Sequence, residues 1–351
     1  MREYELWFIV SNISNQTKIE LIKKYNNEEN IYNNIDSIDN YYIYKSGEYE
    51  RLKSTEISRG VELFQYINKN NINYITIKSE YYPENLREIN DAPYVLFYKG
   101  DISLLNCNMV AIVGSRKNST YGEVVTRQIV GELSNMDYGV VSGVAYGIDA
   151  IAHKECLNRK IKTVGVLGCG IDVIYPKANK LIYNEIEKNG LLISEFLPNT
   201  KPMPYNFPVR NRIIAALSKG VVVIEATVKS GSLITVNYAL QYGKEVMAVP
   251  GPVLSSNSKG CNLLLRDGAK MFVELDDLYY FLNVIKKEGN NIENNSTKLL
   301  LNKVISNEPI HLDKIIQCVN VDRMALFELL FEMQNRNEII CLPGNYYARI
   351  N

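Results

Sequence analysis

The chain has 351 residues, and its 46% hydrophobic and 22% charged content is that of a globular protein with at least one sizeable core. Its 39 basic and 39 acidic side chains cancel, so a polyanion could bind only at a local concentration of Lys and Arg. The sequence has only two histidines, so we expect no zinc site and no His-based triad. Its six cysteines are scattered, which predicts free thiols. It has no signal-peptide core and no run near the ~20 apolar residues of a membrane span, so we expect a cytoplasmic protein.

The first part of the chain, residues 1–75, is polar, rich in Asn and Tyr, and only weakly periodic. Apolar residues recur at helical spacing within residues 6–13 and again within residues 19–22. We predict a small helical module here, of the SAM or helix-hairpin-helix type.

Residues 76–285 alternate short apolar runs with longer segments at helical spacing. The expected strands read MVAIVG, GVVSG, KTVGVLG, LLISEF, VVVIEA, EVMAVPG and AKMFVEL. Because these runs are continuously apolar rather than alternating, we expect helices on both faces of the sheet. The repeated strand–helix units predict an α/β fold with a doubly wound, mostly parallel sheet.

The C-terminal part begins with a polar, low-complexity stretch at 286–296 that predicts a linker. In residues 297–351, three segments at helical spacing precede two short strands around Pro343-Gly344-Asn345, an order that predicts a winged helix. Residues 298–351 hold six basic and six acidic side chains, whereas strong duplex binding usually needs a basic excess. We therefore favour a protein-contact or structural role over DNA reading for this part.

Glycines, hydroxyls and cations follow the expected strands at their carboxyl ends, where ligands bind in an open α/β sheet. Glycine lets the backbone approach an anion closely, and amides at helix starts point toward it. Five such loops with four cations can hold several phosphates in a row, which favours an extended polyanion. The candidates, in chain order, are Gly114, Ser115, Arg116, Ser142, Gly143, Gly168, Gly170, Lys177, Lys229, Ser230, Gly231, Ser232 and Lys259.

Some of these loops contain residues that also suit a purely structural role. Gly114 could serve only a tight turn, and Arg116 could form a salt bridge with a neighbouring carboxylate. Asp149 could cap or brace a loop, because no partner for a catalytic carboxylate is evident. His153 fits a packed core position better than a catalytic base.

Nucleotide-binding motifs are absent from the sequence. GSRKNSTYG does not match G-x-G-x-x-G, and no acidic residue closes a second strand at the ribose position of a dinucleotide. No G-x-x-x-x-G-K-[ST] loop occurs, so ATP-driven work is not expected. We expect no cofactor.

Seven stretches of the sequence form a recognisable series. In order, they are GSR at 114–116, SGVAYGIDAIAH at 142–153, LGCGIDVIYP at 167–176, FPVRNRIIAALS at 207–218, SGSLITVNYAL at 230–240, VPGPV at 249–253 and GCNLLLRDGA at 260–269. The segment YYPENLREINDAPYVLFYKG at 81–100 precedes them. Taken together, these stretches resemble the DNA-processing protein A family, also called DprA or Smf, and the resemblance covers about residues 75–275.

The resemblance implies an extended Rossmann-like fold that binds single-stranded DNA (ssDNA) and is not an enzyme. Gly114, Ser115 and Arg116 match the family's phosphate pocket, and Lys177 matches the lysine that follows Tyr-Pro. The basic segment FP-x-RNR places Arg210, Asn211 and Arg212 either on the DNA or as braces of the loop. Bases would be splayed, and stacked on an aromatic ring that the sequence does not identify.

The resemblance also implies a cellular role and partners. Members protect incoming ssDNA in natural transformation, help load RecA in homologous recombination, and relieve inhibition by single-strand-binding protein. They dimerise through the sheet domain, so we expect a homodimer and no membrane association.

Two other functions stay open at this point. A nucleotide hydrolase similar to the cytokinin-activating phosphoribohydrolases would carry Pro-Gly-Gly-x-Gly-Thr and a nearby glutamate, whereas the matching place reads KSGSLITVNYAL. A transcription regulator would bind one duplex tightly through residues 296–351.

Overall fold

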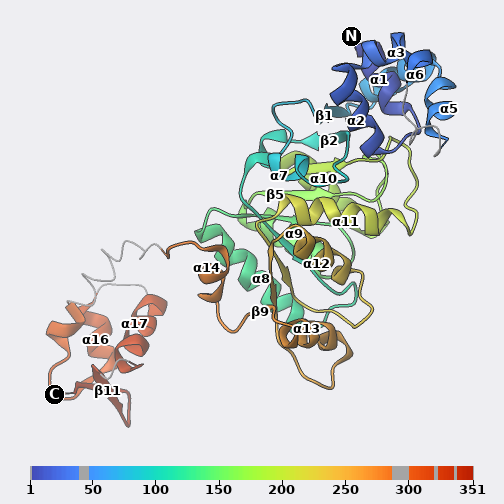
Figure 1. Cartoon of the computed structure of the whole chain (residues 1–351). Coiled ribbons are helices and arrows are strands. Elements are labelled where there is room, and N and C mark those ends of the chain that lie inside the picture. The colour runs from blue at the N-terminus through green and yellow to red at the C-terminus, as the bar shows by residue number, and fades with distance from the viewer. Residues whose placement is uncertain (1, 39–46, 287–299, 320–322, 336–337, 351) are drawn as a thin grey trace. The chain divides into compact units, whose positions relative to one another are not determined.

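The computed structural model describes residues 2–38, 47–286, 300–319, 323–335 and 338–350 of the chain (Figure 1). The chain divides into two compact units, Met1–Ile285 and Lys286–Asn351. Of the predicted linker 286–296, Lys286 is described and residues 287–296 lie outside the described residues. None of the described helices is both long and apolar enough to cross a membrane.

The first unit begins with short helices that share one apolar core. Trp7 and Phe8 of the first helix are fully buried in this core. The first and last of these helices pack closely because Gly60 has no side chain: a Cβ there would lie 2.6 Å from the backbone N of Trp7. The helices are α1 (Arg2–Val10), α2 (Asn15–Tyr25), α3 (Glu28–Asn33), the 3₁₀ turn η1 (Ile35–Ser37), α5 (Glu48–Lys53) and α6 (Ile57–Lys69).

A nine-stranded sheet follows, in the order β1-β2-β6-β5-β4-β3-β7-β8-β9. The seven strands from β3 to β9 pair in parallel, as the repeated strand–helix units predicted. The strands are β1 (Asn73–Thr76), β2 (Val95–Gly100), β3 (Met109–Val113), β4 (Gly139–Ser142), β5 (Thr163–Val166), β6 (Leu191–Ser194), β7 (Gly220–Val223), β8 (Glu245–Ala248) and β9 (Lys270–Met271).

Strands β1 and β2 were not predicted. They extend one edge of the sheet as an antiparallel pair, with β2 antiparallel to β6. Their sequences are short and flanked by polar residues, and β1 spans the boundary expected at residue 75, so pattern alone did not separate them from the helical segment. The helices α1–α6 and strand β2 share a core that contains Phe97 and Leu192, which joins the N-terminal helices to the sheet.

Both faces of the parallel sheet are covered by helices, which explains the continuously apolar strands. In β3, Val110 and Ile112 face one apolar core, and Ala111 and Val113 face another. The helices are α7 (Glu84–Arg87), η2 (Ile102–Asn106), α8 (Thr120–Asn135), α9 (Ile148–Arg159), η3 (Lys177–Asn179), α10 (Lys180–Asn189), α11 (Asn206–Leu217), α12 (Ser232–Gln241), α13 (Ser256–Arg266) and α14 (Asp277–Leu282).

The strand order reverses at β3, which positions the candidate site. From β3 the chain adds β4, β5 and β6 on one side, and then returns to place β7, β8 and β9 on the other. The connection that leaves the carboxyl end of β3 therefore leads toward β4, and the one that leaves β7 leads toward β8, on the other side. Two such diverging connections open a crevice between them.

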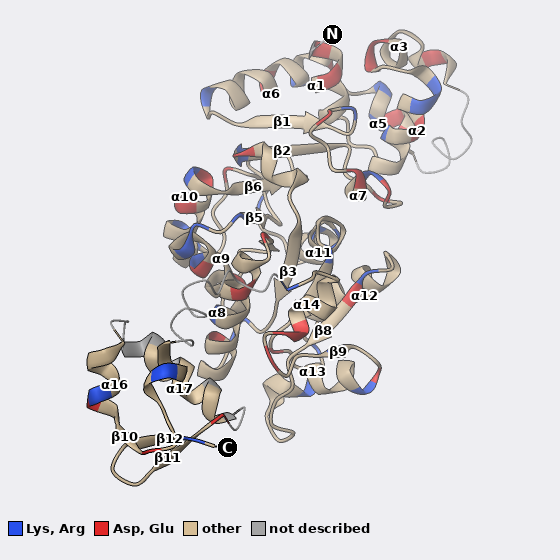
Figure 2. Cartoon of the chain, turned by 90° about the vertical axis from the view of Figure 1, so that its left-hand side faces the viewer, with Lys and Arg blue, Asp and Glu red and all other residues tan. Residues whose placement is uncertain are grey.

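The second unit has a small antiparallel sheet in the order β10-β12-β11. Leu301, Ile315, Leu330 and Tyr347 belong to its apolar core. Its elements are a helical segment at residues 300–304, β10 (Ile310–His311), α16 (Leu312–Cys318), α17 (Arg323–Asn335), β11 (Ile339–Leu342) and β12 (Tyr346–Arg349). Figure 2 shows basic and acidic residues interspersed along the elements of both units.

Candidate functional site

A cavity of about 610 Å³ opens at the carboxyl edge of the sheet, at the crevice between β3 and β7. Three segments line most of it: residues 113–117 after β3, residues 202–214 leading into α11, and residues 227–235 at the start of α12. Of the residues predicted from the sequence, it brings together Gly114, Ser115, Arg116, Arg210, Asn211, Ser230, Gly231 and Ser232.

The loop after β3 is held against the start of α9, which explains its glycine. A Cβ on Gly114 would lie 2.7 Å from Cγ1 of Ile148. The backbone N–H of Ile148 donates to the carbonyl of Ser115 at 3.2 Å, and Gly147, at φ +74°, leaves room for that same carbonyl. The loop is thus fixed by α9, and its next residue, Arg116, is exposed.

Arg116 points its charge over an aromatic ring rather than into a salt bridge. Its guanidinium carbon lies 5.7 Å from the centre of the Phe207 ring. Within the described parts of the chain it forms no ion pair, so the salt-bridge alternative does not apply there. An exposed guanidinium beside a ring remains available to an anion.

The floor of the cavity is a buried cluster that braces the loop after β4. Arg210 donates from Nη1 to the carbonyls of Gly143, at 2.8 Å, and Val166. Oδ2 of Asp149 accepts the backbone N–H groups of Gly143 and Ala145, at 3.1 and 3.4 Å. Burial raises the pKa of the Asp149 carboxyl, and the charge of Arg210 opposes that rise. Asp149 therefore has the bracing role that the sequence left open.

The start of α12 forms the opposite rim. The hydroxyls of Ser230 and Ser232 are 2.7 Å apart, and the amide of Asn211 donates to the carbonyl of Gly231 at 3.2 Å. A Cβ on Gly231 would meet no atom within 4 Å, so this backbone is open to a ligand. Amide groups at a helix start carry partial positive charge, which favours an anion at this rim.

Two aromatic residues and three prolines also line the cavity; we call them the aromatic wall and define it as Tyr175, Phe207, Pro202, Pro204 and Pro208. The Phe207 ring lies close to the guanidinium carbons of both Arg116 and Arg210, at 5.7 and 5.9 Å, and 5.5 Å from the Tyr175 ring. Sequence reasoning missed Phe207, although an aromatic residue just ahead of two arginines in FPVRNR is a usable signal. It also missed Lys117, which lines the same cavity.

Other predicted residues lie outside the cavity lining. Lys177, Lys229 and Lys259 are exposed cations on the loops or helices around it. Four further residues support the neighbouring loops. The hydroxyl of Ser142 donates to the Ile112 carbonyl at 2.6 Å. The three glycines allow close packing: a Cβ on Gly143 would clash with Arg210. A Cβ on Gly168 would clash with the Phe207 ring, and a Cβ on Gly170 would clash with the backbone N of Asn199.

Arg212, a predicted phosphate contact, does not line the cavity. Its side chain is buried, and Nη1 and Nη2 donate to the Glu195 carboxylate at 2.6 and 2.8 Å. Its Nε lies 2.8 Å from a carboxylate oxygen of Asp91. Since each of its three nitrogens already faces a protein acceptor, Arg212 braces α11, which is the second of the two roles expected for the FP-x-RNR segment.

The helix start most typical of nucleotide binding is already occupied. Ser119, which precedes α8, donates its backbone N–H and its hydroxyl to the buried carboxylate of Glu225, at 2.8 and 2.6 Å. A Cβ on Gly122 would also collide with this carboxylate. A nucleotide phosphate at the start of α8 would meet the negative charge of Glu225. This agrees with the mismatch between GSRKNSTYG and the dinucleotide motif G-x-G-x-x-G.

His153 does not serve the cavity as a base. It is fully buried, with Nδ1 2.8 Å from the Thr163 hydroxyl. Burial, with the charge of Arg210, lowers the pKa of His153 to about 3, so the ring is neutral near pH 7. It is the packed core histidine that the sequence favoured, and the described residues contain no cluster of metal-ligating side chains.

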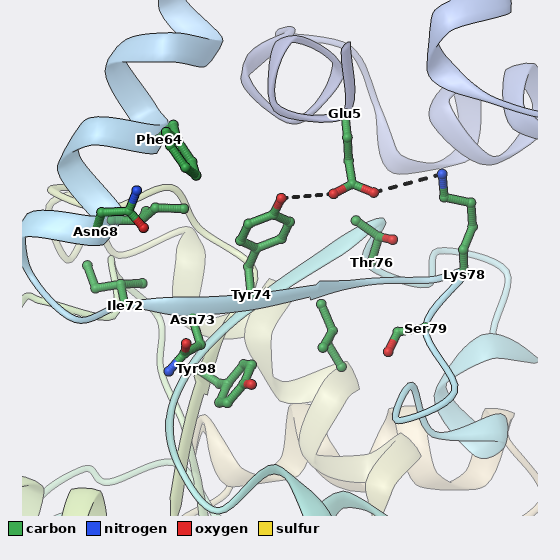
Figure 3. A pocket seen from close by; sticks show the side chains of 12 residues that line it. Glu5, Phe64, Asn68, Ile72, Asn73, Tyr74, Thr76, Lys78, Ser79 and Tyr98 are labelled. Atoms are coloured by element: carbon green, nitrogen blue, oxygen red, sulfur yellow. Dashed lines mark hydrogen bonds and ion pairs between the residues drawn. The ribbon is translucent and has the colours of Figure 1, made fainter. Parts of the chain in front are cut away.

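A second cavity, of about 480 Å³, lies between α1, α6 and β1 (Figure 3). Its basic residue, Lys78, is ion-paired with Glu28 at 2.5 Å and with Glu5 at 3.9 Å. Glu5 also accepts the hydroxyl of Tyr74 at 2.8 Å. Because this cation is neutralised by carboxylates, the cavity is poorly suited to an anion.

Comparison with known families gives a match over the same region. The model of a family described as DNA recombination-mediator protein A matches residues 73–283. DNA processing protein DprA of Streptococcus pneumoniae is 44% identical over 203 residues, 58% of this chain and 72% of the relative. Protein Smf of Borreliella burgdorferi is 32% identical over 323 residues, 90% of this chain and 95% of the relative.

Solved structures show the same likeness. The crystal structure of DNA processing protein A from Streptococcus pneumoniae has a TM-score of 0.70 at 36% identity, and the match covers 80% of this chain and 98% of that one. DNA processing protein A from Helicobacter pylori, whose structure concerns its single-stranded DNA binding mode, has a TM-score of 0.55 at 32% identity, with coverage of 60% and 95%.

Proposed function

Because the matched family spans more than half of the chain, the protein belongs to the DNA recombination-mediator protein A family, and we propose that it binds ssDNA along the sugar-phosphate backbone. The observation that carries this proposal is the convergence, in one cavity, of the Gly114–Ser115–Arg116 loop, the start of α12 and an aromatic wall. The relative from Helicobacter pylori, a binder of ssDNA, supports it.

Phosphates would bind on the two rims. The backbone and hydroxyl of Ser115 and the cations of Arg116 and Lys117 form one rim, and Ser230 and Ser232 at the start of α12 form the other. Backbone amides, hydroxyls and guanidinium groups are the usual phosphate ligands and carry no sequence information. Binding would therefore depend little on base sequence.

A base would stack on the aromatic wall. The Phe207 ring lies beside two guanidinium groups and the Tyr175 ring, so a base placed there is close to the phosphate contacts on either side. Stacking on an aromatic ring is tolerant of sequence, since every base has a π face. Phe207 is the ring that we assign to this role.

The path of the strand would continue beyond the cavity over exposed cations. Lys177, Lys229 and Lys259 are exposed on neighbouring loops and helices, and none of the three forms an ion pair within the described residues. Arg210 lines the cavity, and its buried guanidinium holds the cavity floor through the Gly143 and Val166 carbonyls. Although the net charge of the whole chain is zero, the proposed DNA path carries a local set of basic residues.

Membership of the family supports a proposal for the cellular role. We propose that the protein protects exposed or incoming ssDNA and helps load RecA in natural transformation and homologous recombination, without enzymatic activity. It would act as a homodimer through the sheet domain and meet single-strand-binding protein on the same DNA. We retain the small N-terminal helical module and the C-terminal winged helix as proposals, supported by α1–α6 and by α16, α17, β11 and β12.

The test is fluorescence anisotropy of a labelled oligo-dT, compared with a duplex of equal length. We expect ssDNA to bind more tightly than duplex, and free AMP or NAD not to compete, because Glu225 occupies the start of α8. Affinity should fall with salt, with a slope of about −0.7 per phosphate contact. Equal binding of duplex, or competition by free nucleotides, would contradict the proposal.

A further inference from the structure

One tyrosine of the N-terminal helices reaches the loops that carry the aromatic wall. The hydroxyl of Tyr66, on α6, donates to Oδ2 of Asp172 at 2.7 Å and lies 3.0 Å from Oδ1 of Asn199. The other oxygen of Asp172 accepts the backbone N–H of Asn199 at 2.8 Å. Asp172 and Asn199 are on different loops, so the hydroxyl of Tyr66 ties the two loops to each other and to α6.

These two loops form part of the cavity wall a few residues further along. Asp172 precedes Tyr175 by three residues, and Asn199 precedes Pro202 by three. The segments 167–176 and 195–205 contain no helix or strand, so hydrogen bonds such as the one from Gly170 to the Thr200 carbonyl, at 2.9 Å, fix their course. The place of the wall therefore depends on bonds made outside the cavity.

A second connection reaches the same wall from α2. The amide of Asn15 donates to Oε2 of Glu195 at 3.3 Å, and its Oδ1 accepts the backbone N–H of Tyr94 at 3.1 Å. Glu195 in turn holds Arg212 on α11, the helix that also carries Phe207. Thus hydrogen bonds link the N-terminal helices to the elements that carry the aromatic wall: to the two loops through Tyr66, and to α11 through Glu195 and Arg212.

We propose that Tyr66 is a positioning residue for the ssDNA site, through which the N-terminal helices hold the aromatic wall beside the phosphate loop. This inference rests on the proposed function. A wall that is already placed before binding saves the ligand the cost of ordering two loops. Tyr66 itself lines neither rim of the cavity, so it acts through Asp172 and Asn199.

The test compares Tyr66→Phe with Tyr74→Phe. Both remove a tyrosine hydroxyl bonded to a carboxylate in the same part of the chain. Tyr74, however, bonds to Glu5 in the second cavity (Figure 3) and does not line the first. We expect Tyr66→Phe to weaken oligo-dT binding about threefold to tenfold, the scale of linked-network mutations. Tyr74→Phe should bind as the wild type does, and both variants should melt at similar temperatures.

A double-mutant cycle separates positioning from a general loss of stability. Asp172→Asn should weaken binding by a similar factor, and the variant with both changes should be no weaker than the weaker single variant. Additive losses, or wild-type affinity in Tyr66→Phe, would overturn the inference. If Arg116→Ala weakens binding while Tyr66→Phe does not change it, this inference fails alone. If the wild type does not prefer ssDNA, the proposed function fails with it.

Discussion

Replacing Arg116 with alanine tests the phosphate contacts most directly. Arg116 is exposed, forms no ion pair within the described residues, and has its guanidinium over the Phe207 ring, so its loss should leave the fold intact. A hydrogen bond to a charged group contributes about 1.5–3 kcal/mol. At 1.4 kcal/mol per factor of ten, we expect the Kd for oligo-dT to rise roughly tenfold to a hundredfold.

The assay is anisotropy of labelled oligo-dT over a series of salt concentrations. Each lost phosphate contact should reduce the slope of log affinity against log salt by about 0.7. Arg59→Ala is the matched control, because Arg59 is an exposed arginine on α6, away from the cavity. It should change neither the affinity nor the slope.

Three results would refute the reasoning behind Arg116. An unchanged slope and affinity in Arg116→Ala would mean that its guanidinium meets no phosphate. An equal loss in Arg59→Ala would mean that binding reflects total charge rather than this cavity. A drop in melting temperature in Arg116→Ala alone would assign it a structural role in the loop.

Three further predictions concern the wall, the brace and a buried lysine. Phe207→Ala should weaken oligo-dT binding by the about 1–3 kcal/mol of one stacked base, while Phe207→Tyr keeps it; equal affinities by anisotropy would exclude stacking there. Arg212→Ala should lower the free energy of unfolding in urea by about 3–5 kcal/mol, because it leaves Glu195 buried without its partner; a loss below 1 kcal/mol would contradict the bracing role. Burial lowers the pKa of Lys18 to about 7 from 10.5, so between these values the unfolded chain binds a proton that the folded chain does not, and stability should rise with pH. Lys18→Met should flatten that rise in urea unfolding at pH 7 and pH 9; the same rise in both proteins would contradict it.

The pattern of the sequence was enough for the sheet and its direction. Continuously apolar runs such as MVAIVG, separated by helical segments, require strands buried on both faces, and the structure has them as β3 to β9. The glycines and hydroxyls after β3 and β7 could be placed at one edge for the same reason, since parallel strands share their carboxyl ends. The edge pair β1 and β2 escaped notice because their short runs lack this repeated context.

Burial and partner choice could not be predicted, because they depend on residues far apart in the sequence. Arg116, Arg210 and Arg212 are the same residue type in the sequence, but their environments differ. Arg116 is exposed at the cavity, Arg210 braces the cavity floor, and Arg212 is paired with Glu195 and Asp91. Asp91 is 121 residues from Arg212. Whether a guanidinium meets a carboxylate, a carbonyl or solvent is decided by that packing.

What the sequence by itself determined is local: the alternation of strands and helices, the glycine loops at strand ends, and the motifs of a family. What only the tertiary structure decided is which of these residues face one cavity, that Phe207 lies between two guanidinium groups, and that Glu225 fills the start of α8. The physical reason is that periodicity reports which face of an element is buried, whereas a binding site requires groups from separate elements to converge, and only packing brings them within hydrogen-bond reach.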